Sequence, residues 1–293
     1  MNEFGKGLGY AGMVMDIQQL KEHYPFLEVG SIGRSVEDRD IPVLRIGSGN
    51  RHIHFNGAFH ANEWITTSLL IRFVREYAEA YAQRGSLQGA DARQMFDQTS
   101  LWVVPMVNPD GVELVLTKPE NQQRHELLEW NGGSTDFSGW KANVRGVDLN
   151  DQFPANWELE RARRQVEHPA SRDYSGSSPL SEPEARAIEA FTRERDFAMV
   201  IAFHTQGEEI YWNYNDYEPV ESEALAERFA EVSGYRAVKL MGSDAGYKDW
   251  FIQEFRRPGF TVETGLGSNP LPYSQLDDMY RKASKIMVEA LKL

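Results

Sequence analysis

Short apolar segments alternate along the chain with longer segments whose apolar residues recur at helical spacing. The short segments predict buried strands, because brief apolar runs bounded by Gly, Pro or Asn are typical of them. They cover residues 41–47, 52–57, 101–107, 197–203 and 259–263. The helical pattern predicts helices over residues 64–84, 181–195, 221–233, 250–255 and 275–293.

This order of elements predicts an α/β fold made of a single domain. Strands that alternate with helices form mostly parallel or mixed sheets that are covered on both faces. We therefore expect a mixed, mostly parallel twisted sheet with helices on both faces. No internal repeat, low-complexity tract or Pro/Ser-rich linker interrupts the pattern. The predicted domain covers residues 28–293, and residues 1–27 are predicted to be an N-terminal extension.

Residues 117–180 break the regular pattern, because they are polar, rich in Gly, Asn, Trp and Arg, and show little periodicity. So long an irregular stretch inside a compact domain is usually functional or mobile. The residues Asn-Pro-Asp-Gly at 108–111, shortly before it, are typical of a turn. We expect the irregular stretch to form a wall of the substrate cleft.

Charge and residue types exclude several classes of function. The 293 residues include 31 Lys and Arg against 44 Asp and Glu, a net charge of −13 that disfavours nucleic acids and anionic membranes as partners. Because the chain has no cysteine, a bound zinc ion would need imidazole and carboxylate ligands. Residues 1–18 lack the features of a signal peptide, and no apolar run reaches the roughly 20 residues of a membrane span. These features predict a cytoplasmic protein.

Metal-binding and acidic side chains follow three of the predicted strands. His60 and Glu63 lie where the second strand passes into a helix, and two later strands lead to His204 and Glu263. Open α/β sheets place their sites beyond the carboxyl ends of the strands, so we expect these side chains to lie together. Two imidazoles and one carboxylate leave a fourth zinc position for water. The predicted ligands of one Zn²⁺ ion are therefore His60, Glu63 and His204.

Each of these residues taken singly has a simpler interpretation. A His-x-x-Glu motif occurs by chance, and a lone histidine at a strand end is more often a hydrogen-bonded structural residue. The agreement of three strand ends favours the metal site. We interpret the other histidines as structural or exposed, and these are His23, His52, His54, His125 and His168.

Several features of the chain occur in a characteristic order. They are residues 33–39, residues 60–63, residues 105–111, residues 146–150, His204 and Glu263. Their order and context resemble the carboxypeptidase A-like zinc peptidase family, from about residue 28 to the C-terminus. The resemblance implies a zinc-dependent peptidase in which Glu263 is the general base. This residue would accept a proton from the metal-activated water and pass it to the leaving amine.

The resemblance also implies a cation that stabilises the oxyanion beside the metal. In the family this cation is an arginine that shortly precedes the Gly-Val-Asp-Leu-Asn loop. Here Arg145 is adjacent to the loop, whereas the aligned position holds Lys141. We expect Arg145 to have this role, with Lys141 as its rival. An ordinary surface salt bridge is the simpler role for either residue.

Two residues depart from the pattern of carboxypeptidases that trim protein C-termini. In those enzymes an Asn-Arg pair binds the terminal carboxylate of the substrate. This chain keeps Asn150 but continues with Asp151, which would repel a carboxylate and attract an ammonium. Tyr247 lies near the place of the family's mobile tyrosine and is a candidate for substrate contact. The alternatives are a loop-capping aspartate and a packed aromatic residue.

Residues 140–157, 245–251 and 256–263 are similar to a bacterial branch of the family. That branch comprises the γ-D-glutamyl-L-diamino acid endopeptidases, which cut the stem peptides of peptidoglycan. The resemblance implies that the substrate is a peptidoglycan-derived peptide, cut between γ-D-glutamate and meso-diaminopimelate. Diaminopimelate carries an ammonium and a carboxylate at its far end, so we expect Asp151 to bind that ammonium.

Other functions remain open at this stage. A metallocarboxypeptidase that trims a C-terminal basic or diamino residue would use the same site. Deacylases of acylated amino acids have similar zinc ligands, but they usually add a C-terminal β domain, for which the predicted helix at 275–293 leaves no room. A non-enzymatic binding protein would need a broken ligand set or a lost general base, and all four residues are present. The sequence leaves the oligomeric state open.

Overall fold

The structure is a computed structural model that describes residues 8–117 and 125–293. In these ranges the strands are β1 (Glu28–Arg34), β2 (Asp40–Ile46), β3 (Arg51–Gly57), β4 (Ser86–Leu87), β5 (Ala90–Asp91), β6 (Thr99–Val104), β7 (Phe197–His204), β8 (Glu209–Tyr211), β9 (Arg236–Val238) and β10 (Gly259–Glu263). The α-helices are α1 (Tyr10–His23), α2 (Ile65–Ala82), α3 (Ala92–Gln98), α4 (Pro109–Leu116), α5 (His125–Trp130), α6 (Trp157–Arg164), α7 (Pro183–Glu194), α8 (Ser222–Ser233), α9 (Tyr247–Phe255) and α10 (Leu276–Lys292). Short 3₁₀ helices are η1 (Ala61–Glu63), η2 (Leu149–Asp151) and η3 (Tyr273–Gln275).

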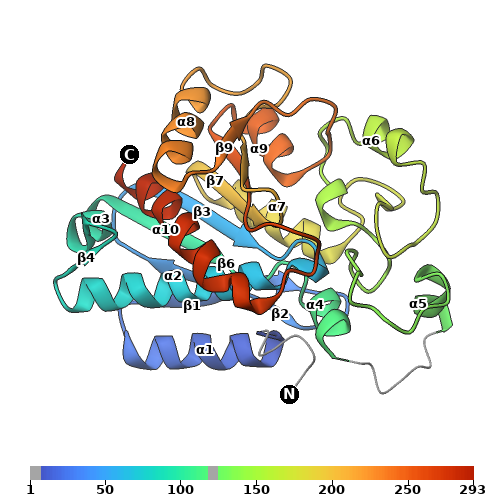
Figure 1. The fold of residues 1–293 in the computed structure, drawn as a ribbon, viewed down its shortest axis with the longest axis horizontal. Coiled ribbons are helices and arrows are strands. Elements are labelled where there is room, and N and C mark those ends of the chain that lie inside the picture. Colours follow the sequence, from blue (N-terminus) through green and yellow to red (C-terminus); the bar gives the residue numbers. More distant parts are fainter. Residues whose placement is uncertain (1–7, 118–124) are drawn as a thin grey trace.

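One twisted sheet runs through the described part of the molecule, with eight strands in the order β1-β2-β6-β3-β7-β10-β8-β9 (Figure 1). Its central strands β6, β3, β7 and β10 are parallel to their neighbours in this group. On the two sides of this group, β2 is antiparallel to β6 and β8 is antiparallel to β10. The predicted α/β fold with a mixed, mostly parallel sheet is confirmed.

The central strands are buried on both faces. In β7, Ile201 and Phe203 pack into one hydrophobic core, while Val200 and Ala202 pack into the other. These four side chains are at most 1% exposed. A strand covered on both sides needs apolar residues at every position, and this explains why the segment was recognisable as a continuous apolar run.

Helices cover both faces of this sheet (Figure 1). The first core includes buried residues of α1, α2, α8 and α10, and the second includes buried residues of α7 and α9. Within the described residues, no helix is both long and apolar enough to cross a membrane. Residues 1–27, predicted to be an extension, include α1, whose Met13, Ile17 and Leu20 are buried in the first core.

The segment predicted as a turn at residues 108–111 instead begins helix α4. The side chain of Asn108 accepts a hydrogen bond from the N–H of Gly111 at 3.0 Å, and Pro109 occupies the first helical position. Asn caps a helix because it satisfies a free backbone N–H, and proline suits the first position because its missing N–H would have no partner there. The same residues are therefore a helix start, and the prediction of a turn was wrong.

The irregular stretch is anchored by buried amides. Its residues 118–124 lie outside the described residues, and the remainder contains α5, η2 and α6. Asn143 donates to the carboxylate of Glu182 at 2.9 Å, and Gln152 accepts the N–H of Glu182 at 3.0 Å. Hydrogen bonds of this kind, between buried polar groups, can hold a loop in place although it is not part of a sheet. Here they hold the irregular stretch beside the ends of the central strands.

A carboxyl group at the start of α7 is fully buried. Glu184 accepts a hydrogen bond from the N–H of Val36 at 3.2 Å. Burial, supported by repulsion from Asp110 and Glu182, raises the pKa of Glu184 to about 7. In the unfolded chain a Glu titrates at about 4.3. Between these two pH values the unfolded chain binds fewer protons than the folded protein, so stability falls as the pH rises.

The variant Glu184→Gln should lose less stability than the wild type as the pH is raised. We expect the difference between about pH 5 and about pH 8 to be about 2–3 kcal/mol. Urea unfolding of both proteins at the two pH values measures it. Glu194→Gln, an exposed position at the end of the same helix, should keep the wild-type dependence. An unchanged dependence in Glu184→Gln would mean that Glu184 is already ionised in the folded protein.

Candidate metal centre

The parallel strands β3, β7 and β10 end at the same edge of the sheet and bring the predicted residues together. His60 follows β3, while His204 and Glu263 are the last residues of β7 and β10. His204 is directly opposite Glu263 in the parallel register. The turn η1 follows His60 and carries Glu63 at its end. The expectation that these strand ends converge is confirmed.

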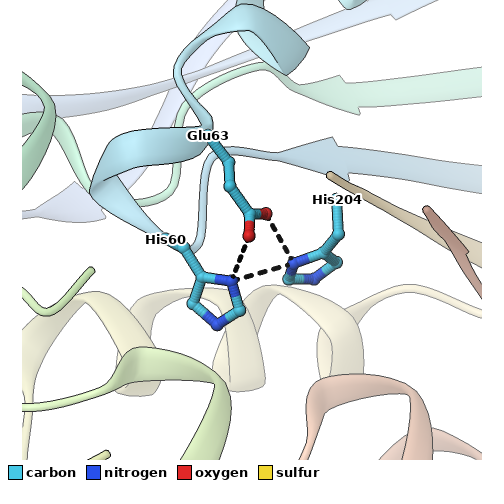
Figure 2. Close-up of side chains that lie close together, drawn as sticks. All are labelled: His60, Glu63 and His204. Atoms are coloured by element: carbon cyan, nitrogen blue, oxygen red, sulfur yellow. Dashed lines mark hydrogen bonds and ion pairs between the residues drawn. The ribbon is translucent and has the colours of Figure 1, made fainter. Parts of the chain in front are cut away.

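His60, Glu63 and His204 face one another as a buried cluster (Figure 2). Nδ1 of His60 lies 2.9 Å from Oε1 of Glu63, and Nδ1 of His204 lies 3.0 Å from Oε2 of Glu63. The two Nδ1 atoms are 3.2 Å apart. Each residue thus offers one ligand atom, and these atoms all lie within 4.8 Å of one another.

The donor set fits a zinc ion. Two imidazole nitrogens and one carboxylate are the ligands of many hydrolytic zinc sites. The second ring nitrogen of His60, Nε2, lies 3.3 Å from Oδ1 of Asp148. A histidine that binds a metal usually directs its other nitrogen at a carboxylate in this way, which fixes the ring. Two facing Nδ1 atoms cannot both carry a hydrogen without conflict, whereas both can offer lone pairs to one cation.

Glu263 lies beside this cluster at the end of β10. Its Oε2 is buried and has no hydrogen-bond partner among the described residues. Burial and then repulsion from Glu63 raise the pKa of Glu263 to about 8, although His60 and Lys141 oppose the shift. A carboxyl group that titrates near neutral pH can both accept and return a proton.

The structure distinguishes the two candidates for the oxyanion-stabilising cation. The carbonyl of Lys141 accepts the N–H of Ala61 at 3.0 Å, and its Nζ lies 2.8 Å from Oδ2 of Asp148. Burial opposes the charge of Lys141, but Asp148 raises the pKa of Lys141 above its ordinary value and keeps it protonated. Arg145 is instead 54% exposed and lies 3.6 Å from Glu182. The geometry favours Lys141 and corrects our preference for Arg145, whose charge is exposed and paired with Glu182.

Asp151 faces another side chain of the protein. It is 2% exposed, and both of its oxygens accept hydrogen bonds from Arg164 of α6, at 2.8 and 3.0 Å. A buried carboxylate needs such a partner, because an unpaired charge is costly to bury. The prediction that Asp151 binds a substrate ammonium was therefore wrong. Its neighbour Asn150 is half-buried and accepts the N–H of Tyr247 at 3.1 Å, and its role in substrate binding stays a prediction.

Tyr247 is a core residue. Its ring is fully buried and packs against Phe59 and Phe153, and its hydroxyl shares a hydrogen bond with Thr192 at 2.9 Å. Helix α9 begins at this residue, and its first turn packs on the sheet. The prediction of substrate contact was therefore wrong, and the alternative of a packed aromatic residue was right.

Two carboxylates at the centre received no role from the sequence. Asp148 lies within the 146–150 motif, and the usual carboxylate partner of a metal-binding histidine was a signal that could have identified it. Glu209 is the first residue of β8 and is directly opposite Glu263. A three-residue strand is too short to show a hydrophobic period, so the pattern did not reveal Glu209.

Comparison with known proteins shows similarity over nearly the whole chain. Residues 13–285 match the family described as zinc carboxypeptidase. Gamma-D-glutamyl-L-diamino acid endopeptidase 1 of Lysinibacillus sphaericus is 50% identical over 286 residues, which cover 97% of this chain and 72% of the relative. Carboxypeptidase B of Rattus norvegicus is 28% identical over 284 residues, 89% of this chain and 64% of the relative. The crystal structure of thrombin activatable fibrinolysis inhibitor has the same fold, with a TM-score of 0.78 and 20% identity over 97% of this chain and 74% of that one.

The metal ligands can be tested through zinc content and thermal stability. Zinc at 100 times its dissociation constant should stabilise the folded protein by about 3 kcal/mol, so a chelator should lower the melting temperature. His204→Ala should retain less than a stoichiometric amount of zinc by emission spectrometry and should show no chelator effect. His52→Ala, at the other end of β3, should bind zinc like the wild type. Stoichiometric zinc in His204→Ala would contradict this ligand set.

Proposed function

Because the chain belongs to the zinc carboxypeptidase family and is a zinc metallopeptidase, we propose that it hydrolyses the bond between γ-D-glutamate and meso-diaminopimelate in peptidoglycan stem peptides. The observation that supports this substrate is the similarity to the γ-D-glutamyl-L-diamino acid endopeptidase of Lysinibacillus sphaericus, which is 50% identical over 97% of this chain. A peptidoglycan-derived peptide is then the partner. The cytoplasmic location stays a prediction from the sequence.

Residues of this chain supply the proton transfers and hold the substrate, and His60, Glu63 and His204 would hold the zinc ion. When bound, zinc polarises the scissile carbonyl and lowers the pKa of a coordinated water towards about 7. Glu263 offers the unpaired Oε2 as the proton acceptor, and the same carboxyl then protonates the leaving nitrogen.

Lys141 is the group that meets the negative charge on the carbonyl oxygen. Asp148 lies near both Nζ of Lys141 and Nε2 of His60, so one carboxylate positions the cation and the ligand ring together. A preorganised charge of this kind, in a site shielded from water, stabilises the transition state more than the ground state. Among the described residues, the side chain of Arg145 pairs with Glu182 and with none of the three ligands.

A carboxypeptidase that releases a C-terminal basic or diamino residue is the second candidate, and the similarity to carboxypeptidase B favours it. The loop geometry disfavours it. Beside Asn150 the chain places Asp151, whose charge is tied to Arg164, and no arginine follows Asn150 to bind a terminal carboxylate. An endopeptidase does not depend on that anchor.

Replacing Lys141 should slow the chemical step. We expect Lys141→Met to lower kcat by about 10²- to 10³-fold with a smaller change in KM, because the lost interaction forms mainly in the transition state. Lys141→Arg, which keeps the charge, should recover part of this loss. Arg145→Met is the matched control and should stay within about twofold of the wild type. Equal losses in Lys141→Met and Arg145→Met would contradict the assignment.

The substrate assignment is tested with L-Ala-γ-D-Glu-meso-diaminopimelate and zinc-loaded protein. Mass spectrometry should detect free diaminopimelate with the wild type and none with Glu263→Ala. The isomer in which the α-carboxyl of glutamate forms the bond should be a poor substrate.

A second peptide separates the two candidate functions. If the carboxyl group next to the scissile nitrogen is blocked as an amide, an endopeptidase still cuts and a carboxypeptidase does not. If a zinc-replete enzyme released no diaminopimelate from any of these peptides, the substrate assignment would be overturned. The assignment of the zinc ligands would not be affected.

A further inference from the structure

Three side chains at the centre lie in one row across adjacent strands. His204 of β7 is opposite Glu263 of β10, and Glu263 is opposite Glu209 of β8. Residues opposite one another on neighbouring strands point to the same face of a sheet. Glu209 therefore extends the centre by one strand. Two strand spacings place it ~10 Å from His204.

Two carboxylates directly opposite one another repel, so the pair Glu263 and Glu209 is an unfavourable feature of the sheet. Oε2 of Glu263 is buried and has no hydrogen-bond partner among the described residues. A cation that lies between the two glutamates would relieve their repulsion.

The existing partners of Glu209 leave it available to a ligand. Tyr211, two residues along the same face, donates its hydroxyl hydrogen to Oε2 at 2.5 Å, and Arg236 pairs with Oε1. The side chain of Glu209 is 20% exposed, whereas that of Arg236 is 72% exposed. An ion pair with a cation so far out in water is weak and easily exchanged.

Other carboxylates near the loop and α9 are held by less exposed cations. Asp148 pairs with Lys141, Asp151 with Arg164, and Asp249 with Lys248, and these cations are 14%, 30% and 6% exposed. A substrate ammonium would have to displace a largely buried partner at each of these positions. Glu209 differs from them, because a substrate ammonium would replace only the solvent-exposed guanidinium of Arg236.

We propose that Glu209 binds the distal ammonium of the diamino acid on the leaving side of the scissile bond, an inference that rests on the proposed function. The leaving nitrogen must lie beside Glu263, which returns a proton to it, and Glu209 is the cross-strand neighbour of Glu263. The distal ammonium of diaminopimelate is as far from its α-carbon as that of lysine. Such a side chain reaches across one strand spacing of ~5 Å.

The test compares two peptides that differ in one group. One is L-Ala-γ-D-Glu-meso-diaminopimelate, and the other carries L-2-aminopimelate, which keeps the distal carboxylate but lacks the distal amino group. The wild type should prefer the first by about 10- to 100-fold in kcat/KM, the range of a charge-assisted hydrogen bond. In Glu209→Gln the preference should fall to about twofold or less. Any effect of the variant on Glu263 cancels in the ratio of the two kcat/KM values, because both peptides are cut with the same general base.

Two further variants exclude a merely structural role. Glu208→Gln removes the neighbouring glutamate, which pairs with Lys282, and should keep the wild-type preference. Arg236→Gln frees Glu209 of its counter-ion and should increase the preference for the ammonium-bearing peptide.

The outcomes separate this inference from the proposed function. Hydrolysis of both peptides at equal rates by the wild type would overturn the role of Glu209 and leave the function in place. A preference retained in Glu209→Gln would do the same. Hydrolysis of neither peptide would overturn the proposed function and this inference together.

Discussion

The parallel register of β3, β7 and β10 is the constraint on which the site depends. The three strands are parallel neighbours, so their carboxyl ends lie at one edge, where each leads to a functional side chain. Close packing on both faces of these strands fixes that register, because a slip of one residue would move every side chain into a space shaped for another. The positions of His60, His204 and Glu263 are therefore a consequence of core packing. The same packing keeps the two Nδ1 atoms 3.2 Å apart, with one oxygen of Glu63 beside each of them.

Charge pairing around the ligands is the second requirement, and it explains which predictions failed. Asp148 and Asp151 are both at most 2% exposed, and each is balanced by its own cation, Lys141 or Arg164. The identity of a charged residue does not say whether it faces a ligand or another side chain of the same protein. Asp151 looked available in the sequence because its partner lies 13 positions away in α6. In the folded protein Asp151 is buried and paired with Arg164, so its role is structural.

The sequence was most informative where a pattern is long or where chemistry restricts the choice of residue. Buried strands such as residues 197–203 and the ligand set His60, Glu63 and His204 met one of these conditions. The pattern was least informative where a single local contact decides, as at Asn108, whose capping bond makes a helix of an apparent turn. Tyr247 shows the same limit, because its burial under α9 depends on neighbours distant in the sequence. The branch of the family came from residues 140–157, 245–251 and 256–263, whose similarity does not depend on periodicity.

Strand direction explains why the side chains that follow strand ends in the sequence did not include Glu209. In a parallel sheet the carboxyl ends of all strands meet at one edge, so the site residues predicted from the sequence were residues at such ends. β8 runs antiparallel to β10, so its first residue, not its last, lies at that edge. An acid at the start of a short antiparallel strand therefore joins a site that the parallel strands define. The antiparallel strand thus contributes its first residue to an edge at which the parallel strands contribute their last. The predicted zinc ligands and general base come from the parallel part, and the residue that we propose to distinguish one leaving residue from another comes from the antiparallel strand beside it.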